Sequence, residues 1–118
     1  MNNCIVIIDD NKRQLDGYTK DVINPFSIEA KMKAFGFNTQ TVKGNNLDAI
    51  DEAITKAKSV TDSAVCIVLD TIKGQGVKFF EELLDNHSVK FNTEEVNRAT
   101  DDAKASLKKE IEEEEQHV

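Results

Sequence analysis

Residues 4–11 read Cys-Ile-Val-Ile-Ile-Asp-Asp-Asn, a short apolar run rich in β-branched side chains that stops abruptly at two carboxylates and an amide. The run does not alternate between polar and apolar residues, which is typical of a strand buried on both faces of a parallel sheet. Residues 64–69, Ala-Val-Cys-Ile-Val-Leu, have the same character and also end at an aspartate, Asp70. Two such runs predict an α/β protein built on a parallel sheet.

The segments between these two runs complete a β-α-β-α-β order. Residues 37–42 alternate imperfectly and contain two threonines, so they predict a weaker, peripheral strand. An amphipathic helix is expected at 28–35, with Ser27 as its N-cap. A second helix is expected at 47–57, with Asn45 at its start. The order predicts a partial parallel sheet flanked by helices.

The C-terminal part of the chain predicts helix only. A short amphipathic segment covers residues 77–84, and one long helix begins near Asn92, which is expected to be its N-cap. The long helix has a thin apolar stripe, formed by Val96, Ala99, Ala103, Leu107 and Ile111. We expect one domain over residues 1–109, followed by an acidic helix end over 110–118, which holds five glutamates and no lysine or arginine.

Composition excludes several classes of function. The chain has 118 residues and a formal net charge of −7, so it lacks the basic surplus of a nucleic-acid-binding protein. It contains no apolar run near the ~20 residues that span a bilayer, and no signal-peptide pattern. The two cysteines, Cys4 and Cys66, lie inside apolar runs and are expected in the core. We therefore expect a cytoplasmic protein without nucleic-acid or membrane partners.

Two polar segments, residues 9–17 and 70–76, follow the two buried runs. Each combines glycine, amide and carboxylate groups. In parallel sheets, ligands bind at the carboxyl ends of the strands, where both segments would lie. Ordinary turn chemistry uses the same residue types, so spacing alone leaves a ligand site and plain turns equally open.

Residues 5–17, Ile-Val-Ile-Ile-Asp-Asp-Asn-Lys-Arg-Gln-Leu-Asp-Gly, resemble the thiamine-diphosphate-binding half of the transketolase family. Segments 19–22, 34–37 and 71–77 match that family in the same order, so the resemblance extends into the last helix. It implies transfer of a two-carbon ketol unit between sugar phosphates, with thiamine diphosphate and a divalent metal. Close thiamine-dependent relatives, such as the deoxyxylulose phosphate synthases, have similar loops and stay an alternative.

The resemblance implies a role for two residues at the first loop. Asn11 matches the asparagine whose side-chain oxygen binds the Mg²⁺ that holds the cofactor diphosphate. Arg13 matches the position whose backbone carbonyl completes that coordination. Hard oxygen ligands of this kind suit magnesium. An ordinary turn asparagine is the alternative for Asn11.

The resemblance also implies cofactor and catalytic positions further along the chain. Lys73, Gly74 and Gly76 match the loop near the cofactor, where glycines permit close backbone approach. A solvated surface charge is the alternative for Lys73. His87 matches a histidine near the reacting centre that handles substrate and protons.

Other parts of the family pattern do not occur in the sequence. It contains no Gly-Asp-Gly motif, whose aspartate supplies another metal ligand, and no pyrimidine-binding half with the glutamate that activates the cofactor. We therefore expect a truncated domain that is inactive alone and depends on a complementary transketolase chain or domain. Its open apolar edge predicts self-association, by strand pairing or helix exchange. The alternative is a non-catalytic interaction module, or a partial gene product that binds no cofactor.

Overall fold

The computed structural model describes residues 2–116. The backbone forms two compact units, Met1–Lys73 and Gly74–Val118. Among the described residues, no helix is both long enough and apolar enough to cross a membrane.

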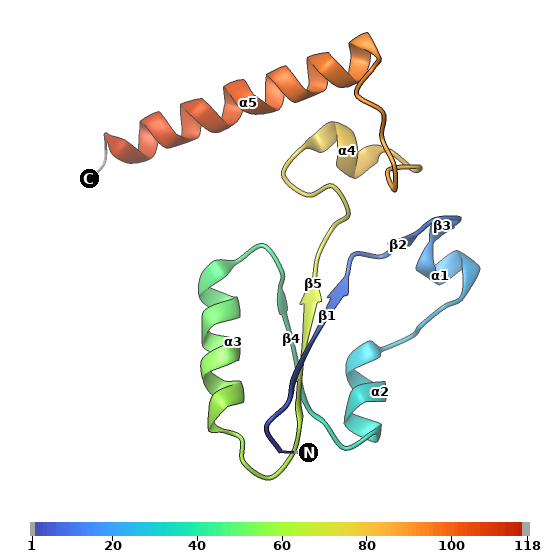
Figure 1. The fold of residues 1–118 in the computed structure, drawn as a ribbon, viewed down its shortest axis with the longest axis vertical. Coiled ribbons are helices and arrows are strands. Elements are labelled where there is room, and N and C mark those ends of the chain that lie inside the picture. Colours follow the sequence, from blue (N-terminus) through green and yellow to red (C-terminus); the bar gives the residue numbers. More distant parts are fainter. Residues whose placement is uncertain (1, 117–118) are drawn as a thin grey trace. The chain divides into compact units, whose positions relative to one another are not determined.

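The first unit contains a three-stranded parallel sheet with the order β1–β5–β4 (Figure 1). The strands are β1 (Ile5–Asp10), β5 (Val65–Asp70) and β4 (Asn38–Lys43). Val65 of the central strand lies opposite both Ile5 and Asn38. The predicted α/β class, the parallel sheet and the peripheral position of the 37–42 strand are confirmed.

Strand β1 lies at the edge of the sheet, where only β5 pairs with it in the described part of the chain. Ile5 and Ile7 are 39% and 54% exposed, so the expectation that residues 4–8 are buried on both faces is wrong. The reason is that the two flanking helices, α2 (Ile28–Ala34) and α3 (Leu47–Ser59), pack on β4 and β5.

Helices α2 and α3 cover opposite faces of the sheet. The hydroxyl of Thr41 donates to Glu29 of α2 at 2.5 Å, while the neighbouring Gln40 donates to the Ala53 carbonyl of α3 at 3.0 Å. Successive strand residues point to opposite faces, so these contacts place one helix on each side (Figure 1). The core lies on the α3 side and is formed by Ala53, Ala57, Val65 and Ile67.

Both helices begin at capping side chains. The Ser27 hydroxyl accepts the backbone N–H three residues on, at 3.1 Å, as predicted. Helix α3 is capped by Asn46, whose side-chain oxygen accepts the N–H three residues on, at 2.9 Å. The expected cap at Asn45 is therefore wrong by one residue, because that residue belongs to the preceding turn.

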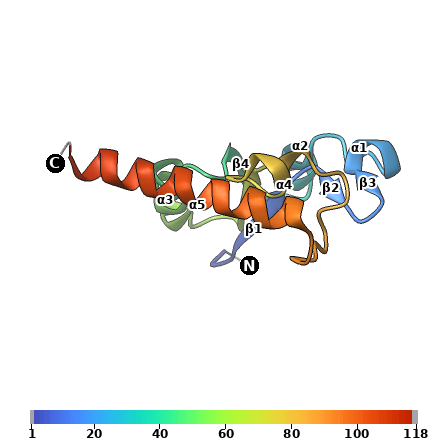
Figure 2. The same cartoon turned by 90° about the horizontal axis from the view of Figure 1, so that it is seen from above.

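The second unit contains two helices, α4 (Lys78–Glu82) and α5 (Glu94–Glu115). Helix α5 is continuous along its whole length (Figures 1 and 2). The Thr93 hydroxyl caps α5 by accepting the N–H of Val96 at 3.3 Å. The expectation that Asn92 is the cap is therefore wrong. The long C-terminal helix itself is confirmed.

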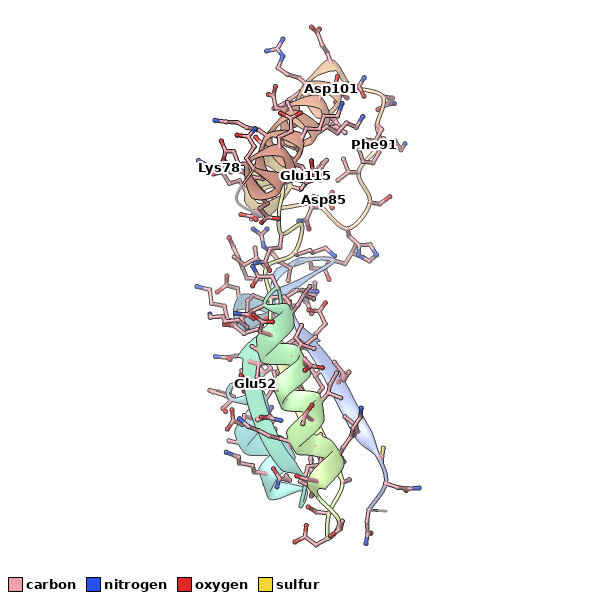
Figure 3. All side chains as sticks on the ribbon, turned by 90° about the vertical axis from the view of Figure 1, so that its left-hand side faces the viewer. Glu52, Lys78, Asp85, Phe91, Asp101 and Glu115 are labelled. Carbon is pink, nitrogen blue, oxygen red and sulfur yellow. The ribbon has the colours of Figure 1, made fainter. Side chains whose placement is uncertain are left out.

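The apolar stripe of α5 is buried at its start only. Leu107 and Ile111 are 57% and 47% exposed. Charged side chains, including Asp101 and Glu115, project from the helix (Figure 3). The helix continues through residue 110 and ends at Glu115, and residues 117 and 118 of the expected acidic segment lie outside the described residues.

Candidate functional site

The carboxyl ends of the three parallel strands meet at one edge of the sheet. Asp10 ends β1, Asp70 ends β5 and Lys43 ends β4, and the register places both Asp10 and Lys43 opposite Asp70. This is the edge at which ligands bind in α/β sheets. The first polar segment, residues 9–17, begins here as the sequence predicts.

Two lysines neutralise the carboxylates at this edge. Lys12 forms ion pairs with Asp10 and, at 3.1 Å, with Asp70, whose other oxygen lies 2.6 Å from Lys43. The hydrogen bonds from Lys43 and then Lys12 lower the pKa of Asp70. Burial alone would lower the pKa of Lys12, but its hydrogen bonds to both aspartates outweigh burial and raise it.

The backbone turns sharply at Lys12, which has a φ of +64°. A non-glycine residue in this left-handed region costs ~1 kcal/mol, and the two ion pairs of Lys12 offset that cost. The Thr71 hydroxyl, from the loop after β5, donates to Asp9 on the same side. The turn is thus fixed to the ends of β1 and β5.

Asn11 lies at the centre of this turn. Its side-chain oxygen accepts the Arg13 N–H at 3.0 Å, and its amide nitrogen donates to Asp9 at 3.1 Å. The amide orientation is therefore set, and an amide oxygen has a second lone pair beyond the one that the turn uses. Asn11 and Arg13, the two residues predicted from the sequence for this loop, lie in the same turn.

A small hairpin follows the turn, formed by β2 (Arg13–Gln14) and β3 (Gly17–Tyr18), and leads into α1 (Thr19–Val22). The Arg13 guanidinium stacks 4.2 Å from the Tyr18 ring centre and lies 3.2 Å from its hydroxyl. The Thr19 N–H donates to the Lys12 carbonyl at 3.0 Å, which closes the hairpin base. Sequence reasoning missed Tyr18, because two-residue strands show no periodicity.

The donors at this edge fit magnesium in kind but not in number. The Asn11 side-chain oxygen and the Arg13 carbonyl are hard oxygens, which magnesium prefers. Within residues 2–116, no group of three or more His, Cys, Asp or Glu residues could hold a metal ion. Two oxygens leave most of a near-octahedral shell to other donors.

The second polar segment, residues 70–76, contains the boundary between the two units. Lys73 ends the first unit, and Gly74 begins the second. Gly74 has a φ of +81°, and a Cβ there would lie 2.8 Å from the backbone of Phe80. Close packing against α4 therefore accounts for this glycine. Gly76, with a φ of +96°, donates its N–H to Glu81 at 2.9 Å.

His87 is exposed in the loop between α4 and α5, in the second unit. Its neighbour Asn86 donates to the Phe80 carbonyl at 2.8 Å, which attaches this loop to α4. The ring of Phe80 also packs edge-to-face against Phe91, with the ring centres 6.0 Å apart. Figure 3 shows Phe91 on the segment that leads into α5.

An open groove of about 1040 Å³ lies within the second unit, between residues 75–80 and α5. Gly76, Phe80 and Phe91 line it on one side, and Leu107 lines it from α5. Of the site residues predicted from the sequence, Gly76 lines this groove.

Comparison with known proteins identifies the family. The sequence model of one protein family, described as the transketolase thiamine diphosphate binding domain, matches residues 1–113. The chain is 41% identical over 111 residues to the 6-deoxy-6-sulfo-D-fructose transketolase subunit SqwG of Clostridium sp. (strain MSTE9), covering 93% of this chain and 38% of that protein. It is 29% identical over 104 residues to an apulose-4-phosphate transketolase subunit of Actinobacillus succinogenes, covering 88% and 37%.

A third relative, the transketolase of Nostoc sp., is 36% identical over 78 residues, which cover 64% of this chain and 12% of that protein. The chain thus spans less than two fifths of the length of each of these relatives. The family match and the turn at the carboxyl edge of a parallel sheet agree with the resemblance in residues 5–17. The chain belongs to the transketolase family, with residues 1–113 matching its thiamine diphosphate binding domain.

Proposed function

We propose that this chain contributes part of the cofactor site of a thiamine-diphosphate-dependent transketolase, which moves a two-carbon ketol unit between sugars. The observation that carries the proposal is the Asn11 turn, with its oriented amide oxygen, at the carboxyl edge of the sheet. Bound thiamine diphosphate would supply the carbanion chemistry of the transfer. The chain's own residues hold and orient it.

In this proposal Asn11 and Arg13 provide two magnesium ligands, through the side-chain oxygen and the backbone carbonyl. Asp9 orients Asn11, because the carboxylate accepts the amide N–H and leaves the amide oxygen for the metal. Lys12 holds the turn on the sheet through Asp10 and Asp70. Outer partners of this kind orient ligands in known metal sites.

The remaining predicted positions belong to the same proposal. Lys73, Gly74 and Gly76 form the loop near the cofactor. His87 is the catalytic residue that handles substrate and protons, and its exposure leaves the imidazole accessible. Histidine suits proton transfer near neutral pH.

A complementary transketolase chain or domain supplies the groups that this chain does not, and the chain alone is not catalytic. The supporting observation is that two relatives of this chain are named as transketolase subunits. Those names specify a sulfo-sugar and a sugar phosphate. We propose a ketose with an anionic group as substrate.

The two free thiols, Cys4 and Cys66, suit a cytoplasmic setting.

The test is calorimetric titration of the full chain with thiamine diphosphate, with and without Mg²⁺. We expect metal-dependent binding that Asn11→Ala weakens by at least ~10-fold, since even the loss of an outer partner that orients a ligand typically costs that much. Asn11→Asp keeps an oxygen that can bind the metal but loses the amide donor to Asp9, so it should weaken binding less than Asn11→Ala does. Circular dichroism of each variant separates loss of a ligand from loss of the fold.

Asn97→Ala is the matched control, because Asn97 is an exposed amide on α5. It should bind as the unmodified chain does. If the chain gives no metal-dependent heat at millimolar ligand, the proposal fails for the isolated chain. The alternative, a non-catalytic interaction module that binds no cofactor, then takes its place.

A further inference from the structure

Thr71, the first residue after β5, contacts the ends of both neighbouring strands at the carboxyl edge of the sheet. Its backbone N–H donates to the Asp10 carbonyl of β1 at 3.3 Å. Its hydroxyl donates to the carboxylate of Asp9 on the same strand. Its methyl carbon lies against Gly44, in the turn that follows β4. The N–H, the hydroxyl and the methyl group of Thr71 therefore each have a partner outside β5.

Gly44 provides the space that the Thr71 methyl group occupies. A Cβ at position 44 would overlap this methyl carbon and would lie 3.0 Å from the Cβ of Leu69. Gly44 has no left-handed φ, so this close approach, and not the backbone conformation, accounts for the glycine. Threonine is branched at Cβ and has few χ1 rotamers. With its methyl group in the space beside Gly44, the Thr71 hydroxyl points to Asp9.

The Asp9 carboxylate connects Thr71 to Asn11. The Thr71 hydroxyl donates to Oδ1 of this carboxylate, and the Asn11 amide nitrogen donates to Oδ2 at 3.1 Å. The terminal torsion of an aspartate has a broad energy minimum, so partners on both oxygens restrict it more than one partner does. The Asn11 side-chain oxygen accepts the Arg13 N–H at 3.0 Å. The Asn11 amide is therefore held at both of its ends, and the hold at its nitrogen depends on Thr71.

We propose that Thr71 is a positioning residue for Asn11, that it acts through Asp9, and that Gly44 keeps the Thr71 hydroxyl in the required direction. This inference rests on the proposed function, in which Asn11 is a magnesium ligand. Partners that orient a ligand without touching the metal are common in metal sites, and their loss typically costs about 10- to 100-fold in affinity. The polar segments 9–17 and 70–76 thus act together on one ligand.

Calorimetric titration of the full chain with thiamine diphosphate and Mg²⁺ tests the effect on binding. Thr71→Val keeps the branched shape and removes the hydroxyl, so it should weaken metal-dependent binding by about 10-fold. Thr71→Ser keeps the hydroxyl and should retain most of the affinity. Thr55→Val is the matched control, because Thr55 is exposed on α3. If the unmodified chain binds and Thr71→Val binds equally well, this inference is overturned and the proposed function stands.

NMR of the full chain without cofactor tests the positioning itself. The Asn11 side-chain NH₂ gives two proton signals, and the proton bonded to Asp9 should be shifted from the value of a free amide. Thr71→Val should move this signal toward the free value, whereas Thr71→Ser should not. The side-chain amide of Asn46, at the start of α3, is the internal control and should stay unchanged in both variants.

The NMR measurement also separates failure of this inference from failure of the proposed function. If Thr71→Val leaves the Asn11 signals unchanged, Thr71 does not position Asn11, whether or not the chain binds cofactor. If the Asn11 signals move as expected but the unmodified chain shows no metal-dependent binding, the positioning is supported and the proposed function alone fails.

Gly44→Ala tests the contact on the other side of Thr71. The added methyl group would displace the Thr71 side chain, so the Asn11 signals should change as they do in Thr71→Val. Combining Gly44→Ala with Thr71→Ser should recover the signals of the unmodified chain, because serine lacks the methyl carbon that position 44 accommodates. If the combined variant folds by circular dichroism but does not recover these signals, the role of Gly44 is contradicted.

Discussion

Asp70 ends the central strand β5 and links it to both neighbouring strands at the carboxyl edge of the sheet. It forms ion pairs with Lys43 at the end of β4 and with Lys12 in the turn after β1. These bonds lower its pKa below the ordinary value of 3.8. The stabilisation is therefore present above 3.8 and is lost as the pH falls from there through the lowered pKa. Asp70→Asn should reduce the free energy of unfolding at neutral pH by less than about 1 kcal/mol, since the pairs are partly exposed.

Urea unfolding at neutral and at acid pH measures this effect. The difference between Asp70→Asn and the unmodified chain should shrink in acid, because Asp70 is then protonated. Asp85→Asn is the control, since Asp85 lies in the second unit (Figure 3). A difference that persists undiminished in acid would contradict the assignment to ion pairing.

At the scale of residues, the sequence predicts what a local motif encodes. Asn11 and Arg13 are two positions apart, so one turn brings them together. Lys12 and Asp70 are 58 positions apart, and their pairing depends on the register of β1 with β5. Nothing in the sequence near Lys12 specifies that register, so this part of the edge could not be predicted.

Among the elements, α3 offers the clearest test of local sequence control. The Asn46 side chain accepts a backbone N–H at 2.9 Å that would otherwise lack a helical partner. Asn46→Ala should therefore destabilise the first unit by about 1 kcal/mol in urea unfolding. Asn45→Ala, one residue earlier, should have almost no effect, and equal losses for the two variants would count against the cap.

The elements also show where sequence patterns stop being informative. Apolar β-branched runs identify β1 and β5, and capping residues and periodicity identify α2, α3 and α5. The position of β1 at the edge depends on which strands lie beside it, and the composition of the strand does not encode that. The hairpin of β2 and β3 escapes prediction because it is held by the stacking of Arg13 on Tyr18.

For the whole molecule, the cluster of buried hydrophobic residues formed by Ala53, Ala57, Val65 and Ile67 lies within the first unit. The partly buried side chains that pack against this cluster, Val42, Ile54, Val60 and Leu69, also belong to the first unit. We expect residues 1–73 to fold alone and to unfold cooperatively, as other small domains of this size do. Circular dichroism during heating, compared with the full chain, measures this.

A destabilised variant provides the control for that experiment. Ile67 is 1% exposed at the centre of the sheet, so Ile67→Ala in residues 1–73 should cost about 2–5 kcal/mol and abolish the cooperative transition. If residues 1–73 melt without cooperativity even when unmodified, the first unit depends on the second for stability.

The left-handed turn at Lys12 allows the charge at the carboxyl edge of the sheet to change at little cost in stability. Glycine at this position would remove a backbone cost of ~1 kcal/mol and an exposed ion-pair gain of similar size, so the net effect on folding is close to zero. The same substitution deletes one of the two positive charges beside Asp10 and Asp70. The electrostatic potential at this edge is therefore adjustable by one residue, separately from the stability of the sheet beneath it.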